Sequence, residues 1–123
     1  MAVPILKLGD YLIASIQSAL ADDDLARLQD DLARKVGDLH SRGVVVDVTG
    51  ADVMDSFTIR TLLDIAHVGK LRGAETVIVG LQPDVAFAMV QLGLRLDGVA
   101  TGLDLEEGIA ILDDRRDGGS DGA

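Results

Sequence analysis

A run of valines from Val44 to Val48, interrupted only by Asp47, is the feature that most constrains the fold of this chain. Such a dense β-branched run is typical of a strand that is buried on both faces. Gly50 and Asp52 then break the pattern, and apolar residues recur at helical spacing from Phe57. The sequence therefore predicts a strand, a loop and a helix in immediate succession.

Similar patterns extend this unit in both directions. Gly9 and Asp10 separate two short apolar runs, which predicts an antiparallel hairpin, and Pro4 favours an edge position for the first strand because proline lacks a backbone donor. We expect strands over Val3–Leu8, Tyr11–Ile16, Val44–Val48, Glu75–Leu81 and Val99–Ala100, and helices beginning at Asp22, Ser56, Pro83 and Asp104. This order predicts an α/β fold with about four helices and a mostly parallel mixed sheet that has an antiparallel N-terminal edge strand.

The length and composition of the chain suit one domain. With 123 residues, 48% hydrophobic content and no cysteine, it can bury one core and forms no disulfide. We expect that domain to cover residues 1–112, followed by a disordered acidic tail over residues 113–123, which has almost nothing to bury. The sequence has no apolar run long enough to cross a bilayer and no basic N-terminus followed by an apolar segment. We therefore predict a soluble cytoplasmic protein.

Charge argues against nucleic acid and membranes as partners. The chain carries 21 acidic and 11 basic residues, and its net charge of −10 repels phosphate backbones and anionic lipid surfaces. Its aromatic content of 2% leaves no stacking platform for bases. The acidity serves either solubility or attraction to a basic patch on a protein partner.

The motifs of several enzyme classes are absent from the sequence. A serine hydrolase would need a histidine near Ser56, but His67 lies eleven residues along the same predicted helix, roughly 16 Å away, and His40 closes the first helix. There is no cysteine, no histidine pair at i and i+4, no calcium-loop pattern and no glycine-rich phosphate loop. We predict a protein that is not an enzyme, with no catalytic residue, no metal site and no cofactor.

The pair Asp55-Ser56 at the predicted helix start has two interpretations. Both residue types cap free backbone N–H groups, so capping is the ordinary reading of either side chain. The other reading is a hydroxyl that is switched by phosphorylation. Asp47 is another candidate phosphoacceptor, because it resembles the aspartate that is phosphorylated in receiver domains. This sequence has no counterpart of the acidic pair and the later lysine of that family.

Eight short segments of the sequence, taken in order, carry a resemblance to a known family. They are Pro4–Leu8, Ser15–Gln17, Gln29–Leu32, Gly43–Thr49, Met54–Phe57, Gly80–Pro83, Leu92–Gly93 and Leu103–Glu106. Together they resemble a STAS domain, the fold of anti-sigma-factor antagonists such as SpoIIAA, and most resemble the RsbS type found in stressosomes. The similarity extends from Val3 to about Leu112.

The resemblance implies a switch that acts through partner proteins. In that family the serine that matches Ser56 is phosphorylated by a partner kinase. The implied partners are an RsbT-type serine kinase that is held until phosphorylation releases it, RsbR-type sensor proteins in a homo- and hetero-oligomeric shell, and an RsbX-type phosphatase. Phe57-Thr58-Ile59 departs from the small residues that follow the serine in many antagonists. A simple anti-anti-sigma factor that binds an anti-sigma kinase is therefore the second candidate, and a purely structural subunit is a third.

Several side chains near the predicted switch are candidates for the docking face. We expect Asp55 to orient Ser56, and an exposed Thr58 to contribute contacts together with the loop residues Asp10, Gln82 and Asp84. The sequence leaves open whether Thr49, Thr58 or Thr61 is a second phosphoacceptor. A phosphate on Ser56 would meet the positive end of the helix dipole, which the fold tolerates. It would also add negative charge beside Asp52 and Asp55, which weakens the binding of a docked partner.

Overall fold

The computed structural model describes residues 3–17, 20–51, 54–93 and 99–121. Five strands form one sheet in the order β1-β2-β3-β4-β5. Only β1 and β2 pair antiparallel, and the remaining neighbours pair parallel. The elements in chain order are β1 (Ile5–Leu8), β2 (Tyr11–Ser15), α1 (Asp22–Leu39), β3 (Gly43–Asp47), α2 (Ser56–Leu71), β4 (Glu75–Val79), α3 (Pro83–Gln91), β5 (Ala100–Gly102) and α4 (Leu105–Asp121). The predicted order of elements, the hairpin and the antiparallel edge strand are confirmed.

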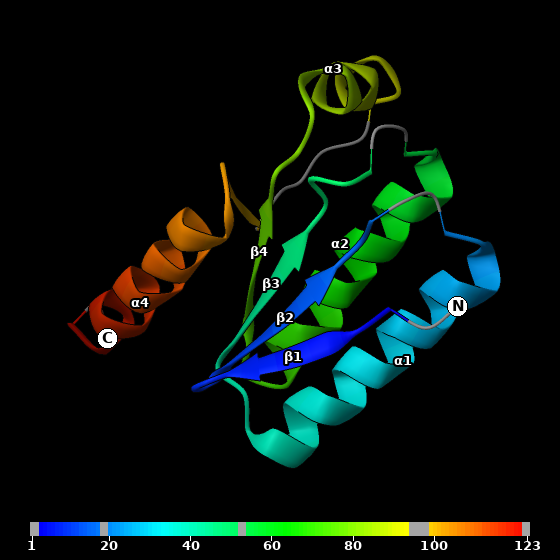
Figure 1. Cartoon of the computed structure of the whole chain (residues 1–123). Helices are drawn as coiled ribbons and strands as arrows, with labels where there is room; N and C mark the ends of the chain where they lie inside the picture. Colours follow the sequence, from blue (N-terminus) through cyan, green and yellow to red (C-terminus); the bar gives the residue numbers. More distant parts are fainter. Residues whose placement is uncertain (1–2, 18–19, 52–53, 94–98, 122–123) are drawn as a thin grey trace.

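The two faces of the sheet are covered by different helices. Figure 1 shows α1 and α2 side by side on one face, α4 on the other, and α3 beyond the ends of the strands. Val44 and Val46 of β3 belong to the core under α1 and α2, whereas Val45 between them belongs to the core under α4. This alternation follows from the two-residue period of a strand and explains why the central run is apolar throughout.

Helix α4 differs from the expectation. The predicted disordered tail begins at Asp113, but the helix continues to Asp121. Polar contacts between described residues hold its later turns to the starts of the strands. The Tyr11 hydroxyl donates to Asp113, Arg116 lies 3.0 Å from Asp10, and Arg115 lies 3.5 Å from Glu75. Apolar burial is therefore not what positions this segment, and a prediction from hydrophobic content alone misses it.

No helix in the described part of the chain is long and apolar enough to cross a membrane.

Candidate functional site

The candidate site lies at the carboxyl ends of β3 and β4, where open α/β sheets commonly bind their ligands. The loop after β3 leads to α2, and the loop after β4 leads to α3. The Gln82 side chain joins the two loops, because its Nε2 donates to the Thr49 carbonyl oxygen at 3.0 Å. Gly80 allows their close approach: its φ is +77°, and a Cβ there would lie 1.9 Å from the Thr49 hydroxyl oxygen.

Asp55 is the N-cap of α2. Its Oδ1 accepts hydrogen bonds from the Thr58 backbone N–H and from the Thr58 hydroxyl, both at 2.8 Å. These two bonds, the backbone bond first, lower the pKa of the Asp55 carboxyl below its ordinary value. The carboxylate therefore stays charged and holds the first turn of the helix.

Ser56 is the first residue of α2 and is exposed. Its hydroxyl makes no hydrogen bond with any residue that the structure describes. The reading of Ser56 as a cap is therefore wrong, because Asp55 fills that role. Both bonds of the Asp55 Oδ1 go to Thr58, so Asp55 fixes the first turn that contains Ser56, and its role in orienting the Ser56 hydroxyl stays a prediction.

The three threonines that are candidates for a second phosphoacceptor differ in accessibility. Thr58 is only 9% exposed, so it is not the exposed docking residue that we expected. Thr61 is also buried, and its hydroxyl donates to the Phe57 carbonyl oxygen at 2.8 Å. Thr49 is exposed at the start of the loop after β3, two residues beyond Asp47. Of the three, Thr49 alone presents an accessible side chain.

The remaining predicted docking residues are divided between two ends of the molecule. Asp84 is exposed in the first turn of α3, and Gln82 is half-buried beside it, so both lie at the same end as Ser56. Asp10 lies at the opposite end, because it precedes β2, and β2 runs parallel to β3 with Tyr11 opposite Gly43. The expected place of Asp10 on a docking face with Ser56 is therefore wrong. Asp52 lies outside the described residues.

Exposed apolar side chains at this end were not expected from the sequence. Phe57 and Phe87 are the only phenylalanines in the chain, and they are 45% and 64% exposed. Helix α3 buries only Val85 and Met89 and leaves Val90 77% exposed. The four-residue spacing of Val85 and Met89 is the signal that could have placed Phe87 and Val90 on the outer side of this helix.

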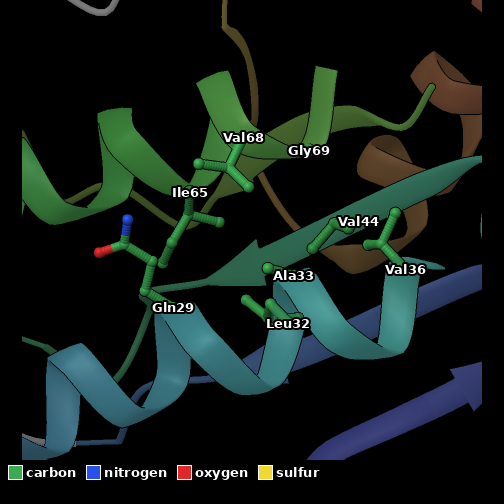
Figure 2. A pocket seen from close by; sticks show the side chains of 8 residues that line it. All are labelled: Gln29, Leu32, Ala33, Val36, Val44, Ile65, Val68 and Gly69. Atoms are coloured by element: carbon green, nitrogen blue, oxygen red, sulfur yellow. The ribbon is translucent and has the colours of Figure 1, made fainter. Parts of the chain in front are cut away.

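The space between α1 and α2 is too small for a ligand. Figure 2 shows side chains of α1, α2 and β3 converging on a cavity of about 10 Å³. Its lining is almost entirely apolar, from Leu32, Val36, Val44 and Ile65 among others. A cavity of this volume is at the lower limit for one water molecule, so this region belongs to the core.

The receiver-type alternative finds little support around Asp47. Its Oδ1 accepts a hydrogen bond from the Thr49 backbone N–H at 2.9 Å and so closes the turn after β3. Among the residues described here, no group of three histidine, cysteine or acidic side chains could hold a metal ion. Receiver domains order their strands 2-1-3-4-5, which differs from the sequential order of this sheet.

Comparison with known proteins identifies the fold and its relatives. The STAS domain matches residues 3–107. A serine-to-glutamate variant of RsbS from Moorella thermoacetica superposes with a TM-score of 0.82 at 32% identity, covering 93% of this chain and 97% of that one. A chain of the stressosome, described as a signal integration and transduction hub, gives 0.77 at 30% identity, with 92% and 98% covered.

A curated relative points to the same group of proteins. RsbRA of Bacillus subtilis (strain 168), named an RsbT co-antagonist protein, is 30% identical over 83 residues. The match covers 68% of this chain but 30% of RsbRA, so the chain spans less than a third of that relative. With its sheet order, its Asp55-capped α2 and the match over residues 3–107, the chain belongs to the STAS domain family and is similar within it to the RsbS and RsbR proteins of stressosomes.

Proposed function

We propose that this protein is a docking module of a stressosome-like assembly that holds an RsbT-type serine kinase and releases it when Ser56 is phosphorylated. The observation that carries the proposal is the exposed Ser56 hydroxyl at the first position of α2, beside a cap that does not use it. The kinase supplies the chemistry, and this chain supplies the acceptor and the docking surface.

The position of Ser56 suits a switch that leaves the fold intact. A phosphate at a helix N-terminus meets free N–H groups and a favourable dipole, worth about 0.3–1 kcal/mol at an exposed site. Asp55 keeps its two bonds to Thr58 whether or not Ser56 is modified, because neither bond involves the serine oxygen. Modification therefore acts on binding and not on folding.

Charge gives the phosphate its effect on a bound partner. The group adds nearly two negative charges beside Asp55 and at the same end as Asp84, both of which are exposed. Unfavourable charge placement at an interface costs several kcal/mol, and about 1.4 kcal/mol corresponds to a tenfold change in affinity. We expect phosphorylation to weaken kinase binding by two to three orders of magnitude.

The two exposed phenylalanines are our candidates for the anchors of the docked kinase. Aromatic side chains are enriched among the residues that dominate binding energy at protein interfaces. Phe57 follows Ser56 directly, and Phe87 lies on α3, which begins at the loop joined to Thr49 by Gln82. A kinase seated on these side chains would place its active site near the Ser56 hydroxyl.

Similarity to stressosome proteins supports a wider set of partners. We propose co-assembly with RsbR-type STAS proteins, because RsbRA and the stressosome chain both match this sequence at about 30% identity. An RsbX-type phosphatase would reverse the modification and return the kinase to its docked state. Homo- and hetero-oligomers are both part of this proposal.

The test uses the RsbT-type kinase of the same organism, purified with this full chain and incubated with Mg-ATP. We expect one added phosphate, mapped to Ser56, and dissociation of the kinase. Ser56→Ala should bind the kinase and keep it, whereas Ser56→Asp should bind it at least about tenfold more weakly. Thr49→Ala, at the neighbouring exposed hydroxyl, is the matched control and should behave as the unmodified sequence does.

Three outcomes would contradict the proposal. Equal kinase binding by the wild type, Ser56→Ala and Ser56→Asp would remove the switch. A hydroxylamine-labile phosphate would indicate an acyl phosphate on Asp47 and favour the receiver-like mechanism. Stable kinase binding without any phosphate would leave a passive scaffold.

A further inference from the structure

A second concave region lies at the end of the molecule opposite Ser56. It has a volume of about 240 Å³ and is lined by Arg42, Gly73, Glu75, Leu112, Arg115 and Arg116. The lining comes from the starts of β3 and β4 and from the later turns of α4. Three arginines therefore line one cleft of a protein whose net charge is −10. Nothing in the proposed kinase switch uses this cleft.

Arg42 has a fixed backbone and an unengaged side chain. Its N–H donates to the Asp10 carbonyl oxygen at 2.9 Å, and its carbonyl oxygen accepts from the Glu75 N–H at 3.1 Å. These bonds hold the residue between the hairpin and β4. Its guanidinium makes no hydrogen bond or ion pair with the residues that the structure describes. A cationic side chain on a fixed backbone, without a partner among the described residues, is available to a ligand.

The other two arginines are engaged with carboxylates at exposed positions. Arg115 lies 3.5 Å from Glu75, and the two side chains are 48% and 38% exposed. Arg116 lies 3.0 Å from Asp10, with 42% and 53% of the side chains exposed. Exposed pairs of this kind contribute little to stability, so a more highly charged anion can displace the carboxylates.

We propose that this cleft binds a small phosphate-bearing anion. A guanidinium presents a planar pair of N–H donors that matches the spacing of phosphate oxygens. A phosphate group has three such oxygens and can therefore accept hydrogen bonds from arginines on different elements. A simple carboxylate has one charge and two oxygens, so it competes poorly with the carboxylates of Glu75 and Asp10 that are already present. A phosphate dianion exceeds each of them in charge and in acceptor number.

The size of the cleft points to a small ligand. Pockets for drug-sized ligands and cofactors occupy about 300–1,000 Å³, and this cleft lies just below that range. The buried side chain of Leu112 forms its apolar wall. Gly73 leaves its side open, because a Cβ added there would meet no atom within 4 Å. Inorganic phosphate and pyrophosphate are therefore suitable probes.

The test is a titration of the ¹⁵N-labelled full chain with sodium phosphate and sodium pyrophosphate at constant ionic strength, followed by NMR. We expect saturable shifts of the Arg42, Gly73 and Glu75 amides. Arg42→Gln should raise the Kd at least about tenfold, because it removes charge-assisted hydrogen bonds. Glu75→Gln should instead lower the Kd at least about threefold, because it removes the competing carboxylate of Arg115.

Controls separate a site from general attraction to charge. Arg34→Gln removes a cation that pairs with Asp31 on α1, outside the cleft, and should leave the Kd unchanged. Sodium acetate at the same ionic strength should produce no saturable shift. Equal shifts with acetate, shifts that do not saturate, or a Kd that is unaffected by Arg42→Gln would each overturn the proposal.

Discussion

At the start of α2, one residue caps the helix and the next residue presents an exposed hydroxyl. Asp55 accepts both hydrogen bonds from Thr58, which leaves the Ser56 hydroxyl exposed. Had Ser56 been the cap, a phosphate on its oxygen would have replaced a bond that the first turn needs. Because Asp55 is the cap, a covalent change at Ser56 leaves that bond in place. This division of roles is what makes the proposed switch compatible with a stable fold.

We predict that Asp55→Ala lowers the free energy of unfolding by about 1 kcal/mol at pH 7, whereas Asp55→Asn changes it little because asparagine also caps. The pKa of Asp55 is lowered in the folded state, so its contribution is present above the ordinary aspartate pKa and is lost as the pH falls through the lower folded value. The difference between the wild type and Asp55→Ala should therefore narrow below about pH 4. Urea unfolding across this pH range measures both effects. An asparagine variant as unstable as the alanine variant would contradict the capping role.

A second prediction at this scale concerns Thr76, whose buried hydroxyl oxygen has no hydrogen-bond partner among the residues that the structure describes. An unsatisfied buried polar group carries a desolvation penalty, and valine has nearly the same shape. Thr76→Val should therefore raise the free energy of unfolding by up to about 1 kcal/mol, as measured by urea denaturation. Ser41→Ala is the matched control, since the buried Ser41 hydroxyl lies 2.9 Å from the Asp10 and Gly43 carbonyl oxygens. That variant should lose stability, and a loss of similar size in Thr76→Val would disprove the interpretation.

At the scale of single elements, replacing two helical glycines with alanine should change the stability of the protein in opposite directions. Alanine favours a helix over glycine by about 1 kcal/mol, so packing decides the outcome. At Gly37 of α1 the new Cβ would lie 2.9 Å from the Arg72 Nη1, which is the tip of a flexible side chain that can move. At Gly108 of α4 it would lie 2.8 Å from the Val79 Cγ1, inside the packed sheet. We expect Gly37→Ala to stabilise the protein and Gly108→Ala to destabilise it, as measured by thermal unfolding. Equal shifts of the unfolding temperature in the two variants would refute this packing argument.

How far the sequence predicts these elements depends on the range of the interactions that form them. Hydrophobic period and cap residues act within one element, and they placed the start of α2 at Ser56 correctly. The later turns of α4 depend on contacts such as Tyr11 with Asp113, which are 102 residues apart, and no local pattern reveals them. The role of Thr58 as the capping partner of Asp55 was within reach, because the backbone N–H three residues after an N-cap is an ordinary donor to the cap. The position of Asp10 at the end opposite Ser56 could also be predicted, because Asp10 precedes a strand that was expected to pair parallel with β3.

At the scale of the whole molecule, the two proposed sites lie at opposite ends of the sheet. Ser56 follows the carboxyl end of β3, whereas Arg42 precedes its first residue. The five residues of β3 separate these ends by about 16 Å at 3.3 Å per residue. A partner docked at the Ser56 end therefore leaves the arginine cleft open, and the two sites can be tested separately in the same chain.

Truncation of α4 tests this separation. A chain that ends at Leu112 loses the contacts of Asp113, Arg115 and Arg116, and we expect its free energy of unfolding to fall by about 1–3 kcal/mol. A chain that ends at Arg116 keeps these contacts and should match the full chain in urea denaturation. Because none of the lost contacts reaches α2 or α3, the shorter chain should still be phosphorylated on Ser56 at the rate of the full chain. Equal stability of the two truncated chains would mean that the later turns of α4 are not held as the structure indicates. Loss of Ser56 phosphorylation in a folded shorter chain would mean instead that the two ends of the sheet are coupled.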